Sequence, residues 1–326
     1  MAKLKAIRAS NSSISSKSFT AVFVGATSGI GLGAIEALLK STTSSKIFIV
    51  GRSKSTFAAT LGILQGLSNS ADIVFIEAQV SLLKEVDRVC AFIKAQESTI
   101  DLLWLSQGGM SLSGYELTSE GLNSRLAITY YSRTLFMHQL MPLVKRSSDP
   151  RIISVLATGH EGPIITTDIG LLDPNNDSFF PAMKQGVTMM SLGMRELSIE
   201  NPKVSFIHTS PGMVSTDVHK KWAGTMTGYL VALRWLVLWV LVPLFILVGW
   251  TSEEAGEIGL YEMTNEKFSA NSGKNFIRLG GNGSGEEEGP QPDLSKYMED
   301  GTQKKVWEHT LGVFDKILAQ KSKVEY

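Results

Sequence analysis

The chain has 326 residues, of which 43% are hydrophobic, so it is long enough to bury a large core in one α/β unit with insertions. Its 31 Lys and Arg residues balance its 31 Asp and Glu residues, and this zero formal charge argues against a nucleic-acid-binding protein, which would carry a basic excess. The single cysteine excludes an intramolecular disulfide and a cysteine metal site, and we expect no metal ion.

Residues 19–24 are apolar and predict a buried strand, and residues 30–40 carry the apolar stripe of a helix. A glycine-rich turn joins them. Glycine lets a backbone pass close to a pyrophosphate, and the N-terminus of the following helix offers unpaired N–H groups and a partial positive charge. The alternative is a tight turn that binds nothing, and the later landmarks disfavour it. The residues expected to hold a dinucleotide here are Gly25, Thr27, Ser28, Gly29, Ile30 and Gly31.

A second buried strand is predicted at 46–50, and it runs directly into Gly51-Arg52-Ser53-Lys54. An acidic residue at this strand end would bind the ribose 2′-hydroxyl of NAD, whereas a basic residue accommodates the 2′-phosphate of NADP. Arg52 offers a forked donor and Lys54 a second positive charge. We therefore predict NADP(H) as the cofactor. The alternative is two solvated charges on a loop.

The remaining segments alternate between strand and helix. Strands are predicted at 73–76, 100–105, 151–155, 204–208 and 275–277, and helices at 82–95, 118–144, 184–197 and from 305 onward. This alternation predicts a doubly wound parallel sheet with right-handed crossovers, a Rossmann-like α/β fold, in one domain over 19–326. The polar stretch 280–292, with its acidic run at 286–288, predicts a flexible surface loop.

Two of these segments resemble landmarks of the short-chain dehydrogenase/reductase family. The turn at 25–31 resembles the family's Gly-x-x-x-Gly-Ile-Gly turn, and Pro211-Gly212 followed by Thr216 resembles its Pro-Gly-x-x-x-Thr loop. The resemblance covers residues 24–216, and the ending from 305 is similar to fungal secondary-metabolite members. It implies that Pro211, Gly212 and Thr216 contact the nicotinamide end of the cofactor. It also implies cofactor contacts for Gln79 near the adenine and for Gln107.

The family's four catalytic positions are mostly changed in this chain. The resemblance places Phe180 at the position of the proton-transferring Tyr, Ala157 at that of the polarising Ser, and Thr129 at that of the Asn. Only Lys184, which in the family holds the ribose and lowers the pKa of the Tyr, is retained. Histidine side chains can exchange a proton near neutral pH, and His160 lies just beyond the Ser position, so it is the candidate proton donor. Thr158 is the candidate that would polarise the substrate oxygen. The alternative for His160 is a loop histidine bonded to backbone.

Three functions fit this pattern. The first is an NADP(H)-dependent oxidoreductase acting on a carbonyl or alcohol of a lipophilic small molecule in secondary-metabolite biosynthesis. The second is a non-redox enzyme of the same fold that isomerises, dehydrates or cyclises its substrate. The third is a non-catalytic NADP-binding protein. Cofactor-binding features do not separate the three, because each retains them.

Residues 229–250 are strongly apolar and long enough to span a bilayer, which takes about 20 residues. A span would place the strand at 275–277 on the far side of the membrane from the rest of its sheet. We therefore predict that 222–250 is a lid over a lipophilic substrate or a segment that contacts a membrane surface.

The composition of residues 1–18 is basic and serine-rich, which also fits a transit peptide. We favour a short N-terminal arm, because the resemblance includes such an arm in fungal members. The expected location is the cytoplasm, with membrane association through 229–250. The resemblance also implies a homodimer that pairs through the two helices flanking the active site.

Overall fold

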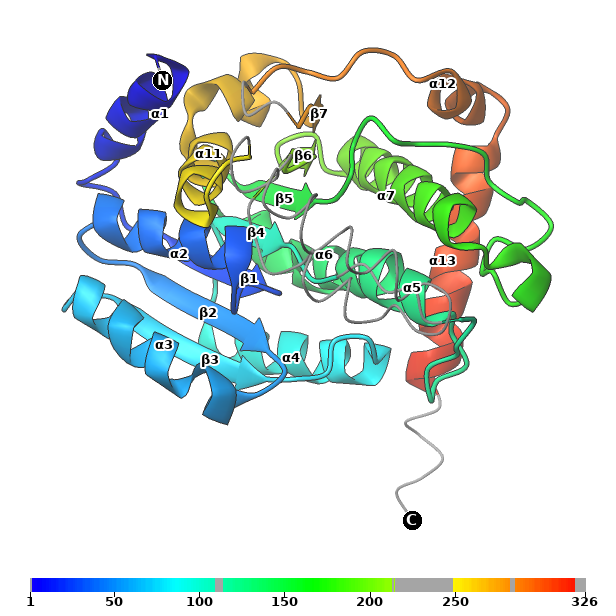
Figure 1. The fold of residues 1–326 in the computed structure, drawn as a ribbon, viewed down its shortest axis with the longest axis horizontal. Coiled ribbons are helices and arrows are strands. Elements are labelled where there is room, and N and C mark those ends of the chain that lie inside the picture. The colour runs from blue at the N-terminus through cyan, green and yellow to red at the C-terminus, as the bar shows by residue number, and fades with distance from the viewer. Residues whose placement is uncertain (1, 109–113, 213, 215–248, 282–284, 320–326) are drawn as a thin grey trace, which may run out of the picture.

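The computed structural model describes residues 2–108, 114–212, 214, 249–281 and 285–319 (Figure 1). Its centre is one seven-stranded sheet in the order β3-β2-β1-β4-β5-β6-β7, in which every neighbouring pair is parallel. The strands are β1 (Thr20–Val24), β2 (Lys46–Gly51), β3 (Asp72–Glu77), β4 (Leu102–Leu105), β5 (Arg151–Val155), β6 (Ser205–Thr209) and β7 (Phe276–Leu279). The doubly wound parallel sheet predicted from the sequence is confirmed. The strand order reverses between β1 and β4, which is where such sheets bind ligands.

Helices cover both faces of the sheet, so its central strands are buried along almost their whole length (Figure 1). One face is covered by α2 (Gly29–Ser41), α3 (Lys54–Leu67) and α11 (Ser252–Thr264). The other is covered by α4 (Leu83–Gln96), α6 (Ser132–Val144) and α7 (Phe179–Glu200). The further helical elements are α1 (Ala2–Ser12), α5 (Ser124–Leu126), η1 (Ala127–Tyr131), η2 (Pro174–Asn176), η5 (Glu266–Phe268), η6 (Ala270–Ser272), α12 (Pro292–Glu299) and α13 (Thr302–Leu318).

The helix predicted over 118–144 begins later, at Ser124. Gly121 turns the chain with a φ of 76°, and the side chain of Asn123 accepts hydrogen bonds from the N–H groups of Arg125 and Leu126 as the N-cap. Glu120 instead caps the neighbouring helix α4, where its carboxylate accepts from the N–H groups of Leu83 and Lys84. The prediction failed because Thr118 and Asn123 bond to backbone N–H groups nearby, and because Glu120 bonds to the start of α4.

The sequence patterns gave incomplete bounds for α7 and did not predict α11. The helix predicted over 184–197 starts one turn earlier, at Phe179, and runs to Glu200. Helix α11 starts with a capping box, in which the Thr251 side chain accepts from the N–H of Glu254 and the Glu254 side chain accepts from the N–H of Thr251. The Thr-x-x-Glu spacing at 251–254 was the signal that would have predicted this helix.

The N-terminal arm contains α1, which packs on α11. Leu4 and Ile7 are buried against Ile258, and Arg8 forms an ion pair with Glu257 at 2.6 Å. The side chain of Asn11 donates to the carbonyl of Glu257 at 2.9 Å. The arm therefore covers the outer side of α11.

Helices α2 and α11 cross at glycines, backbone against backbone. A Cβ added to Gly33 would lie 2.1 Å from the carbonyl oxygen of Ser252, and one added to Gly256 would lie 2.1 Å from the carbonyl carbon of Gly33. One turn along α11, a Cβ on Gly259 would lie 2.5 Å from the ring of Trp104 in β4. The three glycines thus let α11 sit close to both α2 and the sheet.

The C-terminal helix α13 lies across α4, α6 and α7 (Figure 1). Its apolar face, including Trp307 and Phe314, joins the core beneath those helices. The Tyr131 hydroxyl and the His309 Nε2 atom are 2.8 Å apart, and the Tyr130 hydroxyl lies 2.7 Å from that of Thr310. A homodimer stays a prediction, and pairing through α6 and α7 would have to use the surface that α13 leaves uncovered.

The glycine crossing can be tested with two alanine substitutions. Gly33→Ala should lower the free energy of unfolding by about 3 kcal/mol, because the new methyl group meets backbone that cannot rotate away. Gly62→Ala, in the exposed middle of α3 with no atom within 4 Å of the added Cβ, should raise it by about 0.5–1 kcal/mol. Urea unfolding followed by circular dichroism measures both. Equal effects of the two substitutions would contradict the packing described here.

Candidate active site

The turn between β1 and α2 is pressed against the end of β4. Gly25 and Gly29 have φ angles of 75° and 61°, in the left-handed region that favours glycine. A Cβ on Gly25 would lie 2.3 Å from the Cα of Gln107, and one on Gly31 would lie 2.7 Å from the Cβ of Ala26. The glycines therefore serve close packing of the turn as well as its backbone conformation.

The first turn of α2 is open to an anion. The N-cap residue Ser28 has an extended backbone, and its side chain makes no capping hydrogen bond within the described residues. Thr27 lies beside the end of β2, since a Cβ on Gly51 would be 2.5 Å from its methyl group. The N–H groups at a helix N-terminus lack partners inside the helix, and the helix dipole adds a partial positive charge. This end of α2 therefore suits a phosphate group.

The end of β2 presents two exposed cations, Arg52 and Lys54. Between them Ser53 caps α3 by accepting from the N–H of Thr56. A carboxylate is also present, because Glu77 at the end of β3 accepts from the N–H of Lys54 at 2.7 Å. This edge of the site is thus basic with one acidic group among the cations.

Gln79, predicted to contact the adenine, is exposed just beyond the end of β3. Its side-chain nitrogen donates to the Ser81 hydroxyl at 2.9 Å. This contact is local to the loop. Gln79 therefore lies at the same edge of the sheet as Arg52 and Lys54, but its side chain bonds to Ser81 and not to either cation.

Arg133 ties the ends of β4 and β5 together from α6. Its guanidinium donates to the carbonyls of Leu105 and Val155 at 2.9 and 3.0 Å and to the Ser154 hydroxyl at 2.8 Å. It also donates to the carbonyl of Gln107, whose side chain is buried and donates to Ser132. Burial lowers the pKa of Arg133 to about 9, which leaves it charged at neutral pH. Sequence analysis missed this residue, although a lone arginine within an apolar helix was a visible signal.

The loop after β5 carries the two candidate catalytic residues, Thr158 and His160, and their side chains lie in different environments. Thr158 is buried, and its hydroxyl donates to the carbonyl of Leu156 at 3.1 Å. His160 is exposed, and its backbone N–H donates to the carbonyl of Ala157 at 3.1 Å. The Thr158 hydroxyl is therefore engaged with backbone, whereas the His160 ring reaches solvent.

The buried carboxylate of Glu161 fixes this loop to the rest of the fold. It accepts from the N–H of Gly159 at 2.8 Å, from the Ser191 hydroxyl on α7 at 2.8 Å and from Nε of Arg278 on β7 at 2.9 Å. Ser191 also lies 2.8 Å from Nδ1 of the buried His208 on β6. Glu161 is a positioning residue for the turn that presents His160, and the sequence patterns did not single it out.

The acidic run at 286–288, predicted as a solvated loop, is solvated only in part. Glu286 and Glu287 are exposed, whereas Glu288 is half-buried. A Cβ on Gly159 would lie 3.1 Å from the Glu288 carboxyl, so this residue packs against the loop after β5. Gln291 also donates to the carbonyl of Gly159.

Helix α7 carries Phe180 and Lys184 one turn apart on the same side. The Phe180 side chain is 67% exposed and has no ionisable atom. The stem of Lys184 lies against Gly162, where an added Cβ would be 3.0 Å from its Cδ.

The Thr129 hydroxyl donates to the carbonyl of Arg125 at 2.7 Å, within the π-helical turn η1. Such turns occur often at functional sites.

The loop after β6 packs against the loop after β7 at the edge of the candidate site. Gly212 has a φ of 66°, and a Cβ there would lie 1.7 Å from the carbonyl oxygen of Gly281. Val214 pairs with Trp250 in a parallel bridge. Thr216 and residues 222–248 of the predicted lid lie outside the described residues. Within the described ranges no helix is long and apolar enough to cross a membrane.

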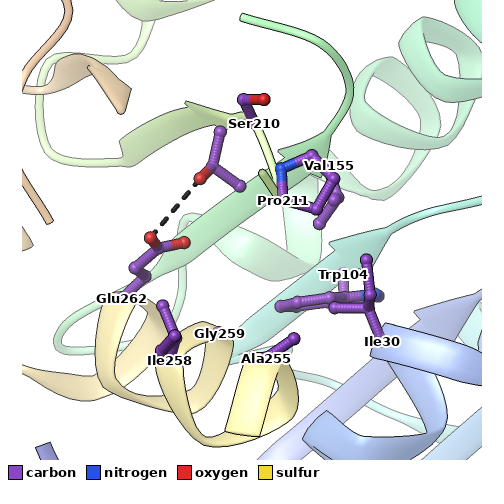
Figure 2. Close-up of a pocket in the computed structure, with 10 residues that line it drawn as sticks. Ile30, Trp104, Val155, Ser210, Pro211, Ala255, Ile258, Gly259 and Glu262 are labelled. Atoms are coloured by element: carbon purple, nitrogen blue, oxygen red, sulfur yellow. Dashed lines mark hydrogen bonds between the residues drawn. The ribbon is translucent and has the colours of Figure 1, made fainter. Parts of the chain in front are cut away.

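A small cavity lies beneath this loop, between the sheet and α11 (Figure 2). Ile30, Ser210 and Pro211 line it on the side of the predicted cofactor contacts, and Glu262 lines it from α11. Its volume of about 20 Å³ has room for one water molecule. No cluster of three or more metal-ligating side chains occurs in the part of the chain that the structure describes.

Comparisons with known proteins agree with this architecture. The chain is 33% identical to oxidoreductase AN1596 of Emericella nidulans, over 97% of this chain and 98% of that protein. It is 31% identical to oxidoreductase lepF of Aspergillus flavus, over 98% of each chain. Its fold is similar to that of L-sorbose reductase from Gluconobacter frateurii, solved with NADPH and L-sorbose, with a TM-score of 0.60 at 16% identity over 83% of this chain and 98% of that one. Residues 19–226 match the sequence model of the short chain dehydrogenase family. The protein described here is therefore a member of the short chain dehydrogenase family of oxidoreductases.

Proposed function

We propose that this protein is an NADP(H)-dependent oxidoreductase acting on a carbonyl or alcohol group of a lipophilic small molecule in secondary-metabolite biosynthesis. The observation that carries the proposal is the pairing of an open helix N-terminus at α2 with two exposed cations, Arg52 and Lys54, at the end of the next strand. The first suits a pyrophosphate and the second a 2′-phosphate. The similar structure of L-sorbose reductase carries NADPH, which supports the same cofactor class here.

The cofactor, when bound, supplies or accepts the hydride. The chain then has to hold the ribose and move one proton at the substrate oxygen. Lys184 lies in the first turns of α7 and would supply the positive charge that holds a ribose hydroxyl. His160 is the exposed titratable group on the loop after β5, and we assign the proton transfer to it. Thr158 would polarise the substrate oxygen only after its hydroxyl turned away from Leu156.

The lipophilic substrate and the cellular location are inferred from the apolar segment 222–250. Val214 and Trp250 pair in the loop after β6, so the chain enters and leaves this segment at one place, on the edge of the sheet where the candidate site lies. We propose that it covers the substrate or contacts a membrane surface in the cytoplasm. The similar oxidoreductases from Emericella and Aspergillus support a role in fungal metabolism.

The cofactor preference depends on Arg52. Arg52→Ala should raise the Kd for NADPH by roughly tenfold or more, since a charge-assisted hydrogen bond contributes about 1.5–3 kcal/mol. The Kd for NADH should change by less than about twofold, because NADH lacks the phosphate that Arg52 contacts. Fluorescence titration of the ligand-free protein measures both constants. Lys203→Ala, an exposed cation in the loop before β6, is the matched control. Equal affinity of the unaltered protein for NADPH and NADH would contradict the assignment.

The proton donor can be tested with His160→Ala. Turnover should fall by roughly two to four orders of magnitude while the Kd for NADPH stays unchanged, because the substitution removes only the proton donor. A panel of lipophilic ketones and aldehydes, followed by the absorbance of the reduced nicotinamide, supplies the substrates. Thr166→Ala, at an exposed position in the same connection, is the control.

Two results would count against the redox assignment. Unchanged turnover in His160→Ala would remove His160 from the mechanism. A product identified by mass without consumption of NADPH would favour isomerisation, dehydration or cyclisation in the same pocket.

A further inference from the structure

Glu262 is a buried carboxyl without a counter-ion in the described part of the chain. It is 3% exposed, and it accepts one long hydrogen bond, from the Thr209 hydroxyl at 3.4 Å (dashed line in Figure 2). Burying a carboxylate without close partners is unfavourable, and burial raises the pKa of Glu262 from 4.5 to about 8. This side chain therefore changes its charge within the range of pH that cells use.

The cavity that Glu262 faces lies directly beneath the predicted nicotinamide side of the site. A dinucleotide places its adenine-side ribose at the end of the second strand and its pyrophosphate at the first helix N-terminus. Here those points are the ends of β2 and β1, so the other half of the dinucleotide extends over β4, β5 and β6. Trp104 and Val155 line the cavity from β4 and β5, Ile30 lines it from the first turn of α2, and Pro211 lines it from the loop after β6.

No other charged group of the described residues lines this cavity. On α11 and on the helices packed against it, Arg8 pairs with Glu257 and Lys40 with Glu253 near the surface. On the sheet, Arg151 pairs with Asp149, and His208 lies beside Ser191 of α7 on the opposite face. Also on the sheet, Lys46 pairs with Glu97, and Arg278 pairs with Glu161. The remaining charged groups of these elements, also outside the lining, are Lys3, Lys5, Glu36, Asp72, Glu77, Glu254, Glu266 and Lys267.

We propose that Glu262 makes this site discriminate between the two redox states of the nicotinamide, because its carboxylate, when ionised, favours the cationic ring of NADP⁺ over the neutral ring of NADPH. This inference rests on the proposed cofactor. For charges roughly 10 Å apart at an effective dielectric constant of about 20, Coulomb's law gives a change of roughly tenfold in relative affinity. Binding of NADP⁺ then releases a proton from Glu262, and binding of NADPH does not.

The test is the ratio of the Kd for NADP⁺ to the Kd for NADPH, measured by calorimetry from about pH 6.5 to about pH 9.5. Both ligands carry the same 2′-phosphate and pyrophosphate, so titration of those groups cancels in the ratio. In the unaltered protein the ratio should fall roughly tenfold as the pH rises through the pKa of about 8. In Glu262→Gln the ratio should stay at its low-pH value. Glu253→Gln, an exposed acid on the same helix, should keep the pH dependence.

The possible results distinguish the role of Glu262 from the proposed binding of the cofactor. A ratio independent of pH in the unaltered protein, or an equal pH dependence in Glu262→Gln, would overturn the role of Glu262 while leaving cofactor binding intact. Failure of both nucleotides to bind would overturn the proposed function itself. Glu262→Met, which also removes the charge, should reproduce the flat ratio of Glu262→Gln.

The charge state of Glu262 also predicts a pH effect on stability without any cofactor. Its pKa is higher in the folded protein than in the unfolded chain, so the folded state binds more protons between about pH 4.5 and about pH 8. Stability from this group is therefore present at low pH and is lost as the pH rises through that range. Glu262→Gln should melt at a higher temperature than the unaltered protein at pH 9, with a smaller difference at pH 5, in thermal scans. An equal difference at both pH values would show that Glu262 is ionised throughout.

Discussion

The close crossing of α2 and α11 fixes the position of several other parts of the fold. Gly33 and Gly256 allow the two backbones to touch, and this contact holds the helix that begins at the glycine-rich turn against the helix that carries Glu262. Gly259 brings the same helix down onto Trp104. A wider crossing would lift α11 from the sheet and open the space beneath Pro211. The site is therefore shaped from below by helix packing as well as from above by loops.

The strand and helix order was readable from the sequence because parallel strands covered on both faces are apolar along their length. The turn at 25–31 was readable for a related reason, since close packing and left-handed φ angles require glycine at its positions. The start of the helix at Ser124 was not readable from hydrophobic periodicity. Asn123 caps that helix through local hydrogen bonds, whereas Glu120 caps α4, which lies far from it in the chain, and neither role shows in the spacing of apolar residues.

The positions of the two cations after β2 were predictable from the sequence, whereas the buried charged groups of the candidate site were not. Arg52 and Lys54 lie where the strand pattern put them, at an exposed strand end. The sequence does not predict the contacts of Arg133, Glu161 and Glu262. Each of these residues lies inside an apolar or loop pattern, and its partners lie on other elements. Sequence spacing reports neighbours along one helix or strand. It does not report which buried charge meets which carbonyl across the sheet.

The bridge between Val214 and Trp250 has a consequence for how such an enzyme diversifies. Because the two residues pair in the loop after β6, the two ends of the connection between them lie side by side. The entropy of closing a loop grows only slowly with its length, so insertions there disturb the sheet little. Residues 215–249 can therefore be lengthened, shortened or exchanged as a cassette while β7 keeps its register beside β6.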